Sequence, residues 1–423
     1  MAIRSARVHA GRPDVWVIGS VGALLLVGLL IVYSSSFTTG LLEFNDANYF
    51  IVRQVIWAAL GVGLMLALMR TDYHALRYLS PLLMLAAVGA LILVLVPGFG
   101  IERNGAQRWI GVGPLPAIQP SEFAKLALIV YVSAWLAGKR NTIQSLALST
   151  IPFVLLVGFV AGLVLLQPDT GTAAVIVLTT VMLFFLAGAS LSHLAALAAI
   201  GSVTAAVLLV AGGGYRMERI FAFTSAEQDP AGRGYQTLQL LIALGSGGVD
   251  GLGLGASRQK FFYVPGAHTD GAFAILGEEL GFLGAVGVVA LFAVLLARGF
   301  RVILRARDDF GALLAAGIVT WLGLQTLINL GGVTRSIPLT GIPMPFLSYG
   351  GSALAAALAG VGVLLSVSRY ATGAAPRGRA DPARKGAPER LEPFRPSRAT
   401  SGRARPLASG RGASRPGGRR GAG

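Results

Sequence analysis

The sequence has no cysteine among its 423 residues. That absence excludes disulfide bonds, thiolate metal sites and a cysteine nucleophile. Histidine is scarce as well, and its four copies are scattered without the spacing of metal ligands: His9, His74, His193 and His268. Charged residues make up only 13%, about half the usual share in a soluble domain. Kinase, P-loop and G-x-S-x-G signatures are also missing, so none of those enzyme classes is indicated.

Long hydrophobic runs dominate instead. Apolar residues make up 54% of the chain, and its mean hydropathy is +0.69. They fall into continuously apolar blocks of roughly 18–25 residues, each long enough for a helix to cross a bilayer core of about 30 Å. The strands of a β-barrel would instead show alternating apolar and polar residues. We therefore predict an all-α polytopic membrane protein with about ten transmembrane helices. They are expected at about residues 15–36, 50–69, 77–98, 121–137, 145–166, 172–188, 191–211, 272–297, 311–330 and 348–368. The first run is too long for a signal-peptide core, so we interpret it as an anchor.

Basic residues in the short loops predict the orientation. They cluster before the first run, around the second loop and after the runs that end near residues 137 and 297: Arg4, Arg7, Arg12, Arg70, Arg77, Lys139, Arg140, Arg298, Arg301, Arg305 and Arg307. The positive-inside rule places these loops and both termini in the cytoplasm.

The charge distribution also predicts three parts: a cytoplasmic N-terminal segment (1–14), a membrane domain (15–370) and a basic tail (371–423). The net charge of the chain is +16, and 13 Lys or Arg residues against three acids lie in the tail. A tail rich in Gly, Pro and Arg is typical of a disordered segment. We expect it to be attracted to anionic lipid and not to nucleic acid, because no aromatic residues alternate with its arginines beyond Phe394.

Four segments then lie on the outer side: 99–120, 167–171, 212–271 and 331–347. The third has about sixty residues, far more than an ordinary loop, which indicates a function. The chain shows no strong internal repeat, which disfavours an inverted-repeat transporter.

The stretch Q-P-S-E-F-A-K, residues 119–125, opens one of these helices. Pro120 and Ser121 predict a helix start with Ser121 as the N-cap. Glu122 and Lys125 are three residues apart and therefore able to pair on one face. Either they form a buried ion pair that pins the helix, or Lys125 binds an anionic group at the outer leaflet while Glu122 orients it.

A second polar stretch, H-T-D at 268–270 followed by Glu278 and Glu279, borders another apolar run. We expect Thr269 or Asp270 to cap the helix. At about 100° per residue, Glu278 and Glu279 lie about 80° and 180° from Asp270, so at most one of them shares a cavity wall with it. A carboxylate at the mouth of an apolar cavity suits a general base, because desolvation raises its pKa.

Cations are frequent in the outer segments: Arg103, Arg108, Arg216, Arg219, Arg233, Arg258 and Lys260. Cations opposite an acid at a membrane surface indicate an amphiphilic substrate with a phosphate-bearing head. The glycine run at 245–257 is only a weak signal for a diphosphate cradle, since no strand precedes it. Trp109 is either an interfacial anchor or a platform for a sugar.

Together these motifs resemble the SEDS family (shape, elongation, division, sporulation) over about residues 15–370. The matching stretches are R-W-I at 108–110, Q-P-S-E-F-A-K, P-D-T-G-T at 168–172, Y-R-M-E-R at 215–219, G-Y-Q at 234–236, H-T-D, G-E-E-L-G at 277–281 and P-F-L-S-Y-G-G-S at 345–352. Within the family, the stretches around residues 104–113, 241–248 and 257–265 resemble the division branch (FtsW) more than the elongation branch (RodA).

The resemblance implies a ten-helix fold and a peptidoglycan glycosyltransferase that polymerises lipid II at the division septum of the bacterial plasma membrane. It places the family's essential aspartate at Asp270, which suits a general base for the acceptor 4-hydroxyl. The leaving diphosphate needs countercharge. The expected substrate-binding residues are Arg108, Glu122, Lys125, Asp169, Arg216, Lys260, His268, Thr269 and Ser348. A class B penicillin-binding protein is the implied partner, and a divalent cation (Mg or Mn) is implied for some members.

The sequence departs from the family pattern at Gly266, where an acid is usual, at Gly271, where an aromatic is usual, and at Arg335, where glycine is common. Arg335 is either an added phosphate contact or a rim residue. We expect Glu278 and Glu279 to tie their helix to its neighbours. Two other functions fit the polar residues: a lipid II flippase, which would carry polar groups at mid-depth and on the inner side, and a non-catalytic scaffold of the divisome.

Overall fold

The computed structural model describes residues 11–103, 106–112, 115–139, 142–211 and 214–372. Most of the predicted N-terminal segment and nearly all of the predicted basic tail lie outside these residues. In chain order the elements are α1 (Val15–Phe44), α2 (Tyr49–Arg70), α3 (Tyr73–Leu95), β1 (Gly100–Arg103), β2 (Ala106–Val112), β3 (Leu115–Ile118), α4 (Pro120–Ala137), the π-helix η1 (Leu146–Thr150), α5 (Ile151–Leu165), α6 (Thr170–Leu186), α7 (Leu191–Ala211), α8 (Gly214–Thr224), the 3-10 helix η2 (Ala226–Gln228), α9 (Tyr235–Ser246), α10 (Ala272–Arg305), α11 (Asp309–Val333) and α12 (Gly351–Thr372).

Helices occupy all ten positions predicted from the hydrophobic runs. Among the described residues, seven helical stretches are long and apolar enough to cross a membrane: α1, α2, α3, η1 with α5, α10, α11 and α12. α6 and the apolar part of α7 are shorter, and α4 carries Glu122 and Lys125. The chain is therefore a multi-pass α-helical membrane protein, and the number of ten spans stays a prediction.

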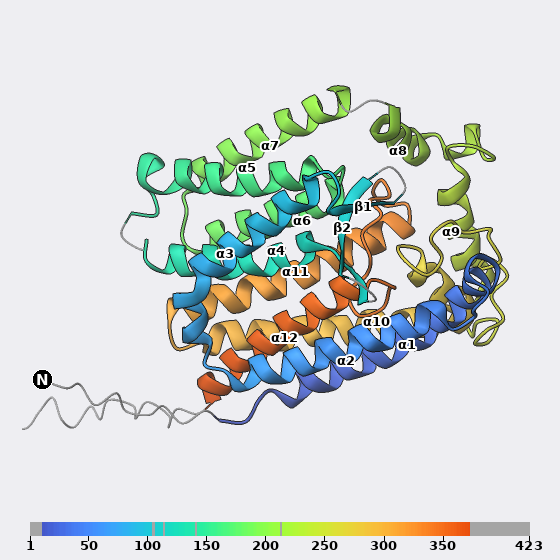
Figure 1. Ribbon diagram of the computed structural model, residues 1–423, viewed down its shortest axis with the longest axis horizontal. Coiled ribbons are helices and arrows are strands. Elements are labelled where there is room, and N and C mark those ends of the chain that lie inside the picture. Colours follow the sequence, from blue (N-terminus) through green and yellow to red (C-terminus); the bar gives the residue numbers. More distant parts are fainter. Residues whose placement is uncertain (1–10, 104–105, 113–114, 140–141, 212–213, 373–423) are drawn as a thin grey trace, which may run out of the picture. The chain divides into compact units, whose positions relative to one another are not determined.

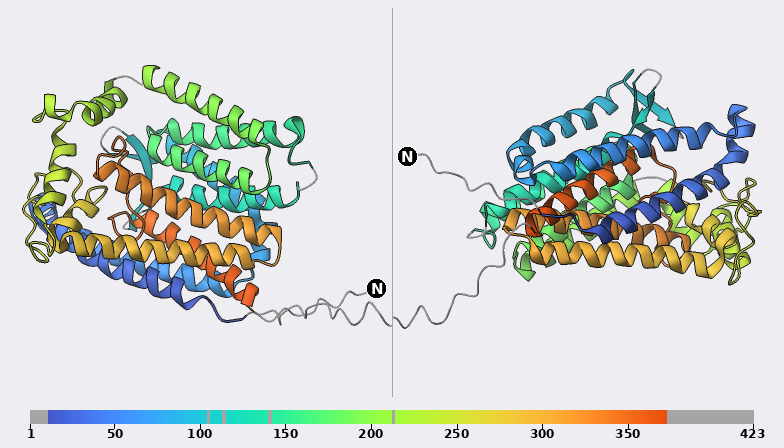
Figure 2. Two further views of the ribbon diagram at one scale, coloured as in Figure 1. Left: turned by 180° about the vertical axis from the view of Figure 1, so that it is seen from behind. Right: turned by 90° about the horizontal axis from the view of Figure 1, so that it is seen from below.

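α12 is the most buried of these stretches, with 89% of its apolar window inside the protein. Small residues allow α2 to approach it closely. A Cβ atom on Gly362 would lie 2.6 Å from the carbonyl oxygen of Met65, and one on Gly351 would collide with the ring of Trp57. Close backbone approach through small residues is the usual way in which membrane helices pack. The two helices lie along each other in the ribbon views (Figures 1 and 2).

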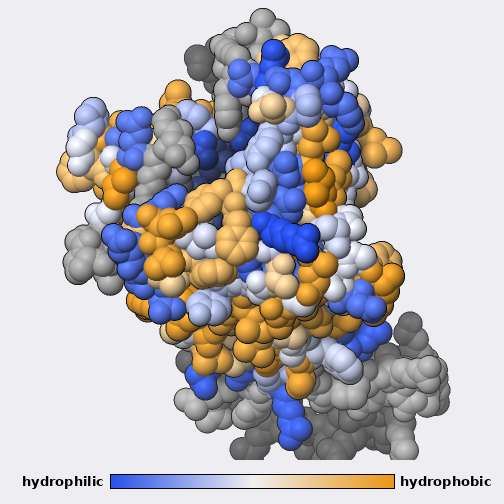
Figure 3. All heavy atoms as spheres, turned by 90° about the vertical axis from the view of Figure 1, so that its right-hand side faces the viewer, coloured by the Kyte–Doolittle hydropathy of each residue, from blue (hydrophilic) through white to orange (hydrophobic). Residues whose placement is uncertain are grey.

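The predicted outer segments contain more structure than the sequence indicated. Segment 99–120 forms a three-stranded antiparallel sheet in the order β1-β2-β3. Segment 212–271 contains α8, η2 and α9. The sheet, α8 and α9 gather at one end of the helices (Figure 1). Hydrophilic and hydrophobic residues are interspersed on this end (Figure 3), as expected of a surface that leaves the membrane.

α10 is interrupted at Gly281, whose φ of 67° and ψ of −168° break the helical hydrogen-bond pattern. The glycine run predicted as a possible diphosphate cradle bridges this break. The N–H of Leu252 donates to the carbonyl of Glu278 at 3.0 Å, and the carbonyl of Gly248 accepts from the N–H of Phe282 at 2.9 Å. The backbone groups freed by the interruption are thereby paired within the protein, as a membrane helix requires.

Candidate active site

A large cavity of about 1020 Å³ opens at the end of the molecule that carries the sheet. Its walls come from the end of α1 and the start of α2, from β2 and β3, and from the starts of α4, α6 and α12. The loops around residues 260–269 and 341–350 complete it. All four segments predicted to lie on the outer side therefore contribute to one cavity.

Asp270 lies beside this cavity, next to the lining residues His268 and Thr269. The hydroxyl of Thr269 donates to Oδ1 of Asp270 at 3.0 Å. Desolvation raises the pKa of Asp270 above its ordinary value of 3.8, while this hydrogen bond, backbone N–H groups and the charge of Arg219 act in the opposite direction. The half-buried carboxyl thus has the environment expected of a general base.

The prediction that Thr269 or Asp270 caps the next helix is wrong. α10 begins at Ala272, and its N-cap is Gly271, with no side-chain hydrogen bond. Asp270 is therefore not on the helix, and the predicted angles to Glu278 and Glu279 do not apply.

His268 packs among aromatic rings. Its imidazole centroid lies 4.6 Å from the ring of Phe50 and 5.6 Å from that of Tyr349. Burial lowers the pKa of His268 to about 4, so its imidazole is neutral at pH 7. In this state His268 shapes the cavity wall and adds no positive charge to it.

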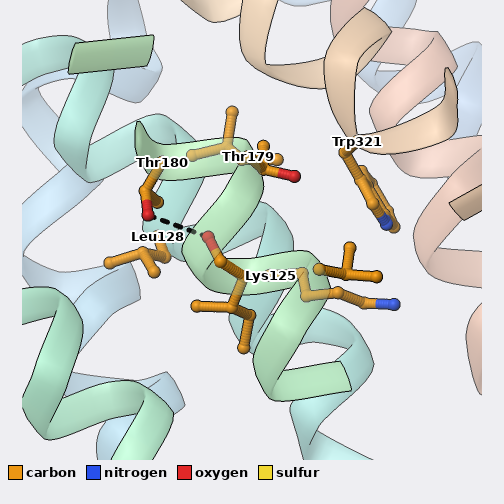
Figure 4. Close-up of a pocket in the computed structure, with 8 residues that line it drawn as sticks. Lys125, Leu128, Thr179, Thr180 and Trp321 are labelled. Carbon is orange, nitrogen blue, oxygen red and sulfur yellow. Dashed lines mark hydrogen bonds between the residues drawn. The ribbon is translucent and has the colours of Figure 1, made fainter. Parts of the chain in front are cut away.

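Glu122 and Lys125 form the ion pair that their spacing predicts. Nζ of Lys125 lies 2.9 Å from Oε2 of Glu122, and both side chains are buried. Glu122 lines the large cavity, whereas Lys125 is not among its lining residues. The ammonium instead donates to Oε1 of Gln325 at 3.0 Å and lies 5.2 Å from the ring centroid of Trp321 (Figure 4). The predicted N-cap Ser121 is wrong, because α4 begins at Pro120 after the N-cap Gln119.

Arg108 and Asp169 both line the large cavity. Nε of Arg108 donates to the carbonyl of Gln167 at 2.9 Å, and its Nη2 donates to the carbonyl of Pro168. Oδ1 of Asp169 caps α6 by accepting from the N–H of Thr172 at 3.1 Å. These contacts hold the 167–169 turn against the sheet, which the sequence did not indicate.

The structure also brings residues to the large cavity that the sequence analysis missed. Arg53 of α2 lines it, donates Nη1 to the carbonyl of Tyr49 at 3.1 Å and stacks on the Tyr49 ring at 3.5 Å. Its only sequence signal is an isolated cation near the start of an apolar run. Trp109, for which the sequence left open an interfacial anchor or a sugar platform, lines the same cavity.

Lys260, which was predicted to bind substrate, belongs to the wall of the large cavity, but its side chain is fully buried. Nζ donates to Oε1 of Glu279 at 3.1 Å, to the carbonyl of Gly255 at 2.6 Å and to the hydroxyl of Ser34 at 3.2 Å. All three ammonium protons therefore have acceptors within the protein.

Glu278 accepts from the hydroxyl of Ser257 at 2.5 Å and from the N–H of Arg258 at 2.9 Å. It thus binds the same loop that Glu279 reaches through Lys260. These contacts agree with the structural role expected for both glutamates.

The remaining predicted site residues lie apart from the large cavity or outside the described side chains. The Ser348 hydroxyl accepts from the N–H of Met344 at 2.9 Å, and Ser352 lines the cavity in its place. The side chain of Arg216 is not described. Arg219, on the same helix, donates Nη1 to the carbonyl of Leu339 at 2.9 Å.

Arg335 pairs with Glu227 through Nη1 and Nη2 and donates Nε to the carbonyl of Phe223 at 3.1 Å. These contacts favour the rim role over a phosphate contact. Its φ of 54° lies in the left-handed region, which explains physically why glycine suits this position.

Among the described residues, no group of three or more His, Cys, Asp or Glu side chains could hold a metal ion. The described side chains therefore do not form a cation site by themselves. The divalent cation stays a prediction from the resemblance, and no catalytic step is assigned to it.

Comparison with known proteins agrees with the resemblance. Residues 15–373 match the family model of the FtsW/RodA/SpoVE cell cycle proteins. Stage V sporulation protein E of Bacillus subtilis is 45% identical over 358 residues, covering 85% of this chain and 97% of that protein. The probable peptidoglycan glycosyltransferase FtsW of Trichlorobacter lovleyi is 40% identical over 352 residues, covering 82% of this chain and 91% of the relative.

Two solved structures share the fold. One is a chain of a peptidoglycan synthase complex, described as coordinating polymerization and crosslinking, with a TM-score of 0.69 and 32% identity over 85% of this chain and 98% of that one. The other is the rod shape determining protein RodA of Thermus thermophilus, with a TM-score of 0.63 and 31% identity over 84% of this chain and 97% of that one.

Proposed function

Since the chain belongs to the FtsW/RodA/SpoVE family, we propose that it is a peptidoglycan glycosyltransferase that polymerises lipid II, with Asp270 as the general base. The identity to the FtsW relative, 40%, exceeds the 31% to RodA. This difference supports a role in division over one in elongation.

The reaction requires a base because a sugar hydroxyl is a poor nucleophile. The 4-hydroxyl of the acceptor N-acetylglucosamine attacks the anomeric carbon of the donor N-acetylmuramic acid. Asp270 takes the hydroxyl proton as the new glycosidic bond forms. The bond to undecaprenyl diphosphate breaks, and the configuration at the anomeric carbon inverts. The diphosphate leaves as an anion, so no second carboxylic acid is needed to protonate it.

One observation carries this proposal: the large cavity, with Asp270 at its edge, also contains guanidinium groups. Its volume of about 1020 Å³ is at the upper end for small-ligand pockets, which suits a disaccharide head group. Arg53 and Arg108 line it, and each guanidinium has five N–H donors, more than the one or two that bind backbone carbonyls here. They supply the countercharge that stabilises a departing diphosphate. Lys125 and Lys260 are occupied by other partners, so we assign them no direct contact with the diphosphate.

The setting of the enzyme completes the proposal. Both termini lie in the cytoplasm, and the large cavity opens on the outer face, where lipid II is consumed. A class B penicillin-binding protein binds it at the septum. The peptidoglycan synthase complex among the solved relatives supports such an assembly.

The test is polymerisation of lipid II by the purified full-length chain, with and without its cognate transpeptidase. We expect Asp270→Asn to lower the rate by about 100-fold or more, since general base catalysis contributes about 10²–10⁴-fold. Asp250→Asn, in an exposed part of the same outer segment, is the matched control and should leave the rate unchanged.

Full polymerisation by Asp270→Asn would remove this residue from the mechanism. Transport of labelled lipid II without polymer would establish the flippase instead.

A further inference from the structure

Two buried carboxamides, Gln325 and Asn329, lie one turn apart on α11. The Nδ2 group of Asn329 donates to two backbone carbonyls: that of Asp270 at 3.0 Å and that of Ile342 at 2.8 Å. Ile342 lines the large cavity. One amide therefore joins α11 to the segment of the proposed base and to the cavity wall.

Gln325, one turn earlier on α11, adds a second link between this helix and the cavity wall. Its Oε1 accepts from Nε1 of Trp321 at 2.8 Å and from Nζ of Lys125 at 3.0 Å. Two donors at the oxygen fix the orientation of the amide. Its Nε2 consequently faces the carbonyl of Pro343, another residue of the cavity wall, at 2.9 Å.

The stability of α11 does not explain why an asparagine stands at position 329. Its Oδ1 is buried and has no hydrogen-bond partner among the described residues. Leaving such an acceptor unpaired costs about 1–3 kcal/mol, which an apolar side chain of similar shape would avoid. The benefit of the amide must therefore lie in the two carbonyls that it holds.

We propose that Asn329, supported by Gln325, is a positioning residue for the catalytic segment. This inference rests on the proposed function, since Asn329 acts through Asp270. It holds the backbone of Asp270 at a set distance from the Ile342–Pro343 wall, against which the substrate binds. A base must lie within about 2.6–3.2 Å of the proton that it removes. A displacement of about 1 Å can lower the rate by about 100-fold.

The same network assigns a role to the Glu122–Lys125 pair. Lys125 orients Gln325, whose Nε2 donates to the carbonyl of Pro343 in the cavity wall. Glu122 neutralises the buried ammonium, which would otherwise be costly. The pair thus acts on the geometry of the large cavity without a direct contact between Lys125 and the substrate.

The test measures lipid II polymerisation by the full-length chain with its cognate transpeptidase, over a series of lipid II concentrations. We expect Asn329→Ala to lower kcat by about 10- to 100-fold, the range for misplaced catalytic groups. KM should stay within about threefold, because Asn329 makes no proposed contact with substrate. Asn329→Ser retains one donor and should recover at least about fivefold of the lost kcat.

The matched control is Thr326→Val. Thr326 is as buried as Asn329 and lies on the same helix, but its hydroxyl donates only to the carbonyl of Leu322 within α11. This variant should keep its kcat within about twofold of the original chain. The folded fraction of every variant is measured by size-exclusion chromatography and thermal unfolding in detergent.

Three results would overturn the proposal. The first is an Asn329→Ala variant that keeps more than half of the original kcat, and the second is an equal loss of kcat in Asn329→Ala and Asn329→Ser. The third is a loss of kcat that is fully accounted for by a smaller fraction of folded protein. Asp270→Asn separates this inference from the proposed function. If Asp270→Asn is inactive and Asn329→Ala is active, only the positioning role fails. If Asp270→Asn polymerises lipid II, the base assignment fails, whatever Asn329→Ala does.

Discussion

Replacing Lys260 with methionine removes one charge from a fully buried ion pair. Its Nζ lies 3.1 Å from Oε1 of Glu279, and neither side chain is exposed. Methionine is similar in length, so little space is left empty. What remains is a buried carboxylate without a countercharge. We expect Lys260→Met to lower the free energy of unfolding by about 3–5 kcal/mol.

A paired variant separates the effect of charge from other effects. Glu279→Gln removes the negative charge but keeps an acceptor for the hydroxyl of Ser34 and the N–H of Ser257, which both bind Glu279. In the double variant both charges leave together. We expect it to regain about 2 kcal/mol or more relative to Lys260→Met alone. The assay is equilibrium unfolding of the purified chain in mixed detergent micelles, titrated with dodecyl sulfate.

The substrate-binding role that the sequence predicted for Lys260 has a different signature. In that case Lys260→Met raises KM for lipid II, while the free energy of unfolding stays within about 0.5 kcal/mol of the original chain. That outcome would refute the reasoning from burial. A loss of stability that the double variant repairs would establish the ion pair as structural.

Three further perturbations follow from the site. Because burial raises the pKa of Asp270 and the charge of Arg219 lowers it, the polymerisation rate should fall as pH drops through the raised pKa. Arg219→Gln should move this acidic limb to higher pH, and an unmoved limb would contradict the coupling. Arg335 lowers the pKa of Glu227 from 4.5 to about 2, so the pair stabilises the fold above pH 4.5 and this contribution disappears as pH falls through about 2. The difference in unfolding temperature between Glu227→Gln and the original chain should therefore shrink over that window; a constant difference argues against it. Gly266 has a φ of +69°, and a Cβ atom there would lie 2.5 Å from Oδ1 of Asp270. Gly266→Ala should cost about 1–2 kcal/mol and lower the rate about tenfold or more, which the same unfolding and polymerisation assays measure.

The sequence predicted where helices form, because every spanning segment must pair its own backbone groups and cover them with apolar side chains. It was less reliable for the helix ends. α1 continues to Phe44, eight residues beyond the predicted end at 36, and α10 continues to Arg305. Hydropathy reports which residues face lipid, and a helix that extends beyond the membrane carries no such signal.

The structure gathers some of the predicted site residues at one cavity, and their roles stay predictions. Arg108, Glu122, Asp169 and His268 line one cavity, as their motifs indicated. Lys260 carries the same chemical signal and belongs to the same wall, but its ammonium binds Glu279. A sequence shows that a cation is present, whereas its direction depends on which acceptors the fold places nearby.

The sequence by itself determined the membrane class, the family and the identity of the carboxylate beside the cavity. These properties depend on composition and on short motifs, which are local. Only the tertiary structure decided that Asn329 holds Asp270, or that the ammonium of Lys260, at the wall of the cavity, pairs with Glu279. Both are contacts between residues on different segments, and their free energies depend on distances and burial that exist only once the helices have packed.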